Sequence, residues 1–224
     1  MTKKEKLKKL ALQRKSFCFD GFRKISEFQG GAFDIEDYVS PWSIGAHNFD
    51  ADVMLIGQDW ASSKWLSNPK NLNFAALGKD PNLMTNRNLD EYLSYFGLNF
   101  SDTYATNAFV FVKEGNMSAK IAKKFLRDSI KDFLLPQIDI VNPKMIICLG
   151  AETYNAVRRE NSYSEIKVSS GQETAMPYMG ADVYGANHTG GHGTKNAGGK
   201  ESAQKQWQIL AGHYQRLKNK LDRV

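Results

Sequence analysis

The stretch ADVMLIGQDW, residues 51–60, decides the fold class that the sequence predicts. Its continuous apolar run, which ends at Gly57, is typical of a strand in a parallel sheet with both faces covered. Gln58 and Asp59 follow, and a glycine before them would let the backbone turn sharply and approach a ligand closely. The stretch therefore predicts a buried parallel strand with polar side chains at its carboxyl end.

The same pattern recurs along the chain. Further apolar runs begin at Thr103 and Pro143, and a weaker one begins at Ala181. Helical patterns lie between and after these runs: near residues 86–97, from an N-cap at Ser118, directly after Gly150, and over residues 201–221. Strands that alternate with helices predict a three-layer α/β/α fold with a central, mainly parallel four-stranded sheet.

The composition suits one globular domain. Hydrophobic residues make up 42% and charged residues 24% of 224 residues, and no apolar run approaches the roughly 20 residues that span a bilayer. The apolar stretch of the basic first segment is far too short for a secretory signal, and no small-residue cleavage site follows, so we expect a cytoplasmic monomer without membrane contact. We divide the chain into a basic N-terminal helix or arm, residues 1–16, and a single domain, residues 17–224.

The net charge of +6 is concentrated at the N-terminus. Residues 1–15 hold seven Lys or Arg and one Glu, which leaves 23 basic and 23 acidic residues in the rest of the chain. The arm is interpreted either as a solvated helix or as a contact for phosphate groups, because lysine-rich helical faces serve both roles. The formally neutral body says little about the partner of the fold itself.

The two cysteines, Cys18 and Cys148, are too few for a disulfide framework or an iron–sulfur cluster, and we interpret both as reduced packing residues. The glycine-rich stretch 185–199 contains His188 and His192. Its glycines are expected to forbid a stable helix, so the two histidines do not form the paired ligands of a metalloprotease helix. A loop metal site, a flexible surface loop and an anion-stabilising imidazole remain as interpretations.

Three polar side chains lie at or near the carboxyl ends of the predicted strands, where open parallel sheets bind ligands. Asp59 follows the first strand, Asn107 interrupts the second, and His188 follows the fourth. Each has a structural alternative. Asp59 could cap the next helix, and the amide of Asn107 could satisfy the backbone instead of reading the edge of a planar ligand.

Four segments, LIGQDW, YATNAFVF, PKMIICLGAETYNAV and GANHTGGHG, resemble the ordered motifs of the uracil-DNA glycosylase superfamily over roughly residues 51–215. Gly57, Gln58 and Asp59 match the start of the motif Gly-Gln-Asp-Pro-Tyr, and the match ends at Trp60 and Ala61. The strand asparagine of the family corresponds to Asn107, and the histidine of its late loop corresponds to His188.

The resemblance implies hydrolysis of the N-glycosidic bond of uracil or a related damaged base in DNA, without metal or redox cofactor. Asp59 would orient the attacking water and balance the positive charge of the sugar. Asn107 would read the edge of the base, and His188 would stabilise the departing anion.

The resemblance also suggests binding roles at the lip of the site. Backbone amides around Gln58, next to Gly57, could share the stabilisation of the anion, and Trp60 or Phe74 could stack on the base. Because Ala61 replaces the family's tyrosine, discrimination against thymine cannot be carried over.

The loop after His188 lacks the bulky apolar wedge of the family, so we expect single-stranded DNA to be handled better than duplex DNA. The alternatives are a catalytically inactive nucleic-acid- or nucleotide-binding relative and a hydrolase acting on small nucleosides.

Overall fold

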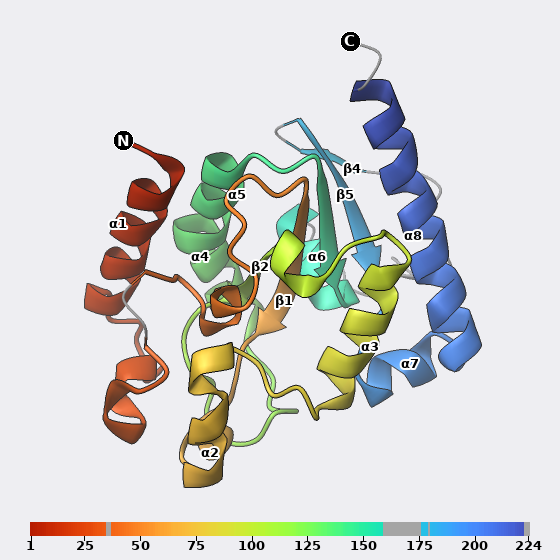
Figure 1. Cartoon of the computed structure of the whole chain (residues 1–224). Coiled ribbons are helices and arrows are strands. Elements are labelled where there is room, and N and C mark those ends of the chain that lie inside the picture. The colour runs from red at the N-terminus through yellow and green to blue at the C-terminus, as the bar shows by residue number, and fades with distance from the viewer. Residues whose placement is uncertain (35–36, 159–175, 179, 222–224) are drawn as a thin grey trace.

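The fold was derived from a computed structural model that describes residues 1–34, 37–158, 176–178 and 180–221. Its central sheet has the strand order β2-β1-β3-β5-β4 (Figure 1). The strands are β1 (Val53–Asp59), β2 (Tyr104–Phe109), β3 (Met145–Leu149), β4 (Met176–Tyr178) and β5 (Ala181–Ala186). All are parallel except β4, which pairs antiparallel with β5. The prediction of four strands missed β4, because three residues are too few to show a pattern.

Strand β1 continues past the glycine at which the apolar run ends. Gly57 lies opposite Asn107 of β2, and Asp59 lies opposite Phe109. The expected sharp turn at Gly57 was therefore wrong, since Gln58 and Asp59 are still part of the strand. Both polar residues lie at the carboxyl end of β1, so their positions are determined by the pairing of this strand with β2.

Helices cover both faces of the sheet. One face carries α1 (Lys3–Ser16), α4 (Lys123–Ser129), a π-helical segment (Ile130–Leu134), α5 (Leu135–Val141) and α6 (Ala151–Arg158). The other face carries α3 (Met84–Ser94) and α8 (Lys200–Leu221). Side chains of β1 alternate between the two cores, with Met54 and Ile56 on the first side and Val53 and Leu55 on the second. This arrangement confirms the three-layer α/β/α architecture (Figure 1).

Short elements gather at the carboxyl ends of the parallel strands, at the bottom of Figure 1. They include α2 (Ser63–Leu66) and α7 (Gly191–Asn196). Within the described residues, 3₁₀ turns are formed by Ile25–Glu27, Gln29–Gly31, Pro41–Ile44, Pro69–Leu77 and Phe100–Asp102.

Helix α7 contradicts the expectation that the glycines of this stretch forbid a helix. Helical hydrogen bonds join Thr194 N to Gly190 O and Ala197 N to Gly193 O. A Cβ atom on Gly193 would lie 1.8 Å from the carbonyl oxygen of His188, so the turn requires a glycine there. Tertiary packing overrides the low helix propensity of glycine at this place.

Two further expectations were also wrong. Ser118 does not cap a helix, because its backbone N–H donates to Asn116 Oδ1 and α4 begins five residues later, after Ala122. Cys148 is buried in β3 as expected, but Cys18 is exposed and is not a packing residue. Cys18 lies in the connection after α1. Of the three residues in the segment FCF, residues 17–19, only Phe19 is buried.

Helix α1 belongs to the same core as the sheet. A capping box between Thr2 and Glu5 starts it. The helix then buries Leu7, Leu10 and Ala11 in the first core. None of the helices in the described part of the chain is both long and apolar enough to cross a membrane.

Candidate active site

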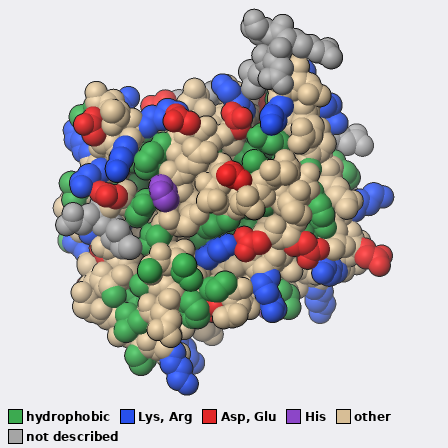
Figure 2. Space-filling view, in the orientation of Figure 1, with side chains coloured by type: hydrophobic (Ala, Val, Ile, Leu, Met, Phe, Trp, Pro, Cys, Tyr) green, Lys and Arg blue, Asp and Glu red, His purple; other side chains and the backbone are tan. Residues whose placement is uncertain are grey.

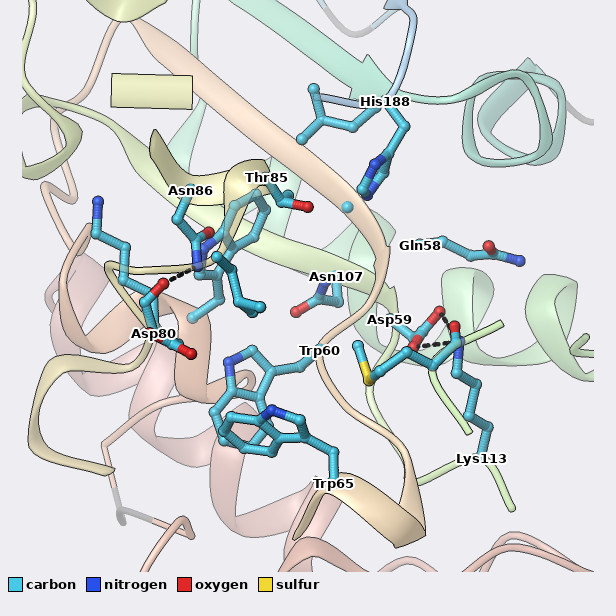
Figure 3. A pocket seen from close by; sticks show the side chains of 16 residues that line it. Gln58, Asp59, Trp60, Trp65, Asp80, Thr85, Asn86, Asn107, Lys113 and His188 are labelled. Atoms are coloured by element: carbon cyan, nitrogen blue, oxygen red, sulfur yellow. Dashed lines mark hydrogen bonds and ion pairs between the residues drawn. The ribbon is translucent and has the colours of Figure 1, made fainter. Parts of the chain in front are cut away.

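A cavity of about 320 Å³ opens at the carboxyl ends of β1 and β2. It is lined by six of the seven residues expected to form a site: Gly57, Gln58, Asp59, Trp60, Asn107 and His188. Figure 3 shows Asp59, Asn107 and His188 arranged around this cavity, although they come from β1, from β2 and from the loop after β5. The seventh residue, Phe74, belongs to the 3₁₀ turn Pro69–Leu77 and is not among the residues that line the cavity.

Asn107 is oriented by a chain of hydrogen bonds from the loop before β1. The hydroxyl of Ser40 donates to Asn107 Oδ1 over 2.6 Å, and the N–H of Trp42 donates to Ser40 Oγ over 3.2 Å. Since Oδ1 already has a donor, the amide nitrogen Nδ2 of Asn107 is left to donate to a ligand. Gly57 permits this placement, because a Cβ there would lie 2.8 Å from Nδ2.

His188 is held as a neutral imidazole. Its Nδ1 atom accepts a hydrogen bond from Gly190 N at 3.0 Å, so the ring hydrogen is placed on Nε2. Burial, assisted by the nearby charge of Lys113, lowers the pKa of His188. The loop is anchored by Asn187 N, which donates to Gln206 Oε1 of α8 over 3.0 Å. The result is an N–H donor that lines the cavity and carries no charge.

Asp59 forms a buried ion pair with Lys113. The Nζ atom of Lys113 lies 2.9 Å from Oδ2 and 3.1 Å from Oδ1 of Asp59, and it also donates to the carbonyl of Met117 over 2.6 Å. Burial raises the pKa of Asp59, and the Lys113 ammonium opposes this effect without cancelling it. The pair places a carboxylate and its cation together on one side of the cavity (Figure 3).

Tryptophans form one wall. The rings of Trp60 and Trp65 meet edge to face with centroids 5.4 Å apart, and Trp60 Nε1 donates to Gly78 O over 2.8 Å. The family motif and this sequence differ at Trp60 and Ala61. Ala61 is buried in a separate core cluster and does not line the cavity, so of these two residues only Trp60 lines it. The side chain of Gln58 points away from Asn107 and donates to Glu152 Oε2 over 2.7 Å (Figure 3).

A comparison with protein families matches a model of the uracil DNA glycosylase superfamily to residues 44–210. The matched region is more than half of the chain and includes every residue named above as lining the expected site. The chain belongs to the uracil DNA glycosylase superfamily. A comparison with curated proteins found no match.

The sequence did not reveal several residues that line or support this cavity. Lys113 follows the apolar run FVFV directly, and a charge at the end of a buried run was a signal that could have been used. Ser40 and Trp42 come from a segment without periodicity, which offered no signal. The remaining unexpected lining residues are Trp65, Lys79, Asp80, Leu83, Thr85, Asn86, Met117 and Leu149.

The alternative of a loop metal site finds no support in the described residues. Within them, no group of three or more His, Cys, Asp and Glu side chains is placed to hold a metal ion. His192 is exposed on α7, and it is not among the residues that line the cavity.

Proposed function

We propose that this protein is a DNA glycosylase that hydrolyses the N-glycosidic bond of uracil or a related damaged base. The proposal rests on one observation above all: Asp59, Asn107 and His188 line a single cavity, although they come from three separate segments. Membership of the uracil DNA glycosylase superfamily supports the same reaction.

Recognition of the base depends on two hydrogen-bond donors. Asn107 Nδ2 and His188 Nε2 both donate, since Ser40 occupies the amide oxygen and Gly190 occupies Nδ1. A base that presents carbonyl oxygens, as uracil does, can accept both bonds. A base with an amino group in place of the carbonyl would leave the buried amide of Asn107 unpaired, at a cost of about 1–3 kcal/mol.

Cleavage of the bond depends on opposite charges that develop on the sugar and the base. Asp59 orients a water molecule, accepts a proton from it, and balances the positive charge of the sugar while the water oxygen bonds to C1′. The C1′–N bond breaks, and its electron pair leaves with the base. The neutral imidazole of His188 then donates its N–H to the base carbonyl and so stabilises the anion that forms there. The tryptophan wall excludes bulk water and offers an aromatic surface for the base.

One observation favours a second candidate, a relative that binds the base without cleaving the bond. Lys113 contacts both oxygens of Asp59, which reduces the capacity of the carboxylate to hold a water molecule. In such a protein the cavity would still accept a base.

Incubation with uracil-containing single-stranded and duplex oligonucleotides, followed by alkaline cleavage of abasic sites, tests the proposal. Asp59→Asn and His188→Ala should each slow the reaction by about 10²-fold or more. The matched controls are Asp50→Asn and His192→Ala, which change exposed residues outside the cavity. A folded wild-type protein that cleaves neither DNA would refute the proposal. Calorimetric binding of uracil without turnover would then support the second candidate.

A further inference from the structure

Two exposed apolar side chains lie at the mouth of the cavity. Leu83 and Met84, at the start of α3, are 42% and 49% exposed. Leu83 also lines the cavity. Figure 2, drawn from the same side as Figure 1, shows further hydrophobic side chains gathered over α2 at this end of the molecule. Burying such side chains only when a ligand arrives is typical of an interaction site.

The start of α3 covers the loop that follows His188. A Cβ on Gly190 would lie 2.8 Å from Thr85 Oγ1, and a Cβ on Gly191 would lie 3.7 Å from the sulfur of Met84. The loop has no side chains at these two positions, and side chains of α3 lie over it instead. The apolar group that the loop lacks is therefore present beside it, supplied by a different segment.

Hydrogen bonds join the two segments into one unit. Thr189 Oγ1 donates to Thr85 O over 2.8 Å, and Asn88 Nδ2 donates to Thr189 O over 2.7 Å. Because Thr189 follows His188 directly, the position of Leu83 and Met84 is coupled to the position of the imidazole. A side chain that enters DNA here would do so at a defined distance from the base in the cavity.

The charge of this rim suits a phosphate backbone. Residues 81–89 and 187–200 contain Arg87, Lys195 and Lys200 and no Asp or Glu, while Lys79 and Asp80, which line the cavity just before them, balance each other in charge. Arg87 and Lys195 are exposed, while Lys200 pairs with Glu91. Exposed cations in the two segments that carry and contact the apolar pair suit a nucleic-acid duplex, since its backbone is anionic and its base stack is apolar.

We infer that Leu83 and Met84 enter the base stack of duplex DNA and fill the gap left by the nucleotide that occupies the cavity. The inference rests on the proposed function and makes duplex DNA a substrate, although the loop after His188 has no wedge of its own. Removing a nucleotide from the stack costs a few kcal/mol, and an apolar side chain in the gap offsets part of this cost. The unbranched side chain of Met84 can adapt to the gap.

The first test compares single-stranded and duplex uracil oligonucleotides of one sequence. The double variant Leu83→Ala/Met84→Ala should lose on the order of tenfold in kcat/KM on the duplex, with little change on the single strand. Leu12→Ala removes a side chain of similar exposure, 48%, from α1 and should change neither rate. Equal losses on both substrates, or a wild-type protein that cleaves only single strands, would overturn the inference.

Met117 is another exposed apolar residue at the cavity, on the side of Lys113. Met117→Ala should leave the ratio of duplex to single-strand rates unchanged. If this variant loses duplex cleavage and the double variant does not, the wedge belongs to the other side of the cavity and the inference is wrong.

A binding measurement separates the inference from the proposed function. The probe is a duplex with an uncleavable abasic analogue and a neighbouring 2-aminopurine, whose fluorescence rises when it is unstacked. Wild-type protein and Asp59→Asn should raise the fluorescence, and the double variant should not. Failure to cleave any DNA counts against the proposed function alone. Absence of a fluorescence rise with wild-type protein, or an equal rise with the double variant, counts against the wedge.

Discussion

The Nζ atom of Lys113 lies 2.9 Å from Oδ2 of Asp59, and both side chains are buried. The ion pair offsets part of the effect of burial, which raises the pKa of the Asp59 carboxyl. Removing only one partner of such a pair leaves a buried charge without compensation. The pair therefore couples the stability of the fold to the ionisation of the residue proposed to orient the water.

We predict that Lys113→Met shifts the pH dependence of the reaction. Burial already raises the pKa of Asp59, and loss of the ammonium removes the main opposing effect. As pH falls, Asp59 will take up its proton earlier, so activity will begin to decline at a higher pH than in the wild type. A pH–rate profile of kcat/KM measures this. Lys120→Met, which removes an exposed lysine, is the control, and identical acid limbs in the two variants would contradict the prediction.

The hydroxyl of Ser40 should act on base recognition through Asn107. Ser40→Ala removes the donor to Asn107 Oδ1, so the amide can rotate and no longer presents Nδ2 in one orientation. We expect a loss of about 1 kcal/mol of transition-state binding, or a roughly fivefold lower kcat/KM. Ser43→Ala is the matched control, because Ser43 is equally buried and bonds to Ala105 O instead. Equal effects of the two variants would show that Ser40 has only a structural role.

Gly57→Ala should reduce activity while the protein stays folded. A Cβ at this position would lie 2.8 Å from Asn107 Nδ2 and 3.2 Å from the ring of Trp42, and both groups line the cavity. We expect the amide to move and kcat/KM to fall by more than tenfold, since small displacements at a site are costly. Gly212→Ala in α8 is the control, because a Cβ there meets only Arg216, at 3.7 Å. Full activity of Gly57→Ala would contradict the proposed role of Asn107 in recognising the base.

The lowered pKa of His188 should appear in the stability of the protein at acid pH. Its ordinary value is about 6.5, and burial keeps the folded form neutral below that value. The unfolded chain then binds a proton that the folded chain does not, so this residue makes the fold less stable as pH falls below about 6.5.

His188→Ala should remove this part of the pH dependence, whereas His192→Ala should keep it. Urea denaturation at pH 7.5 and pH 5.5 provides the free energies of unfolding for both variants. A difference between the two pH values that is the same in both variants would show that His188 does not titrate abnormally.

Much of the sheet and part of the site could be predicted from local sequence patterns. Runs such as VMLI and MIIC are visible because parallel strands are buried on both faces. Asp59, Asn107 and His188 were predicted to lie at one site because the carboxyl ends of parallel strands share one edge of the sheet. The six-residue helix α7 was missed because packing overrides the propensity of its glycines.

The contacts that adjust the chemistry could not be predicted, because they join distant parts of the chain. Lys113 is 54 residues from Asp59, and Ser40 is 67 residues from Asn107. No periodicity within either segment reports such a contact. The place of the wedge was missed for the same reason, since Thr85 and Thr189 are 104 residues apart in sequence yet share a hydrogen bond.

The N-terminal helix should contribute to stability through a second buried ion pair. Arg14 of α1 bonds to Asp34, and both side chains are 2% exposed. Arg14→Met leaves the carboxylate of Asp34 buried with only the more distant Lys15, 3.9 Å away, so we expect a loss of about 3–5 kcal/mol in the free energy of unfolding. Arg23→Met, which breaks an exposed pair with Glu27, should change the urea midpoint little. The double variant Arg14→Met/Asp34→Leu should recover part of the loss, because no charge is then left buried. A midpoint for Arg14→Met equal to that for Arg23→Met would mean that water reaches Asp34 once the arginine is removed.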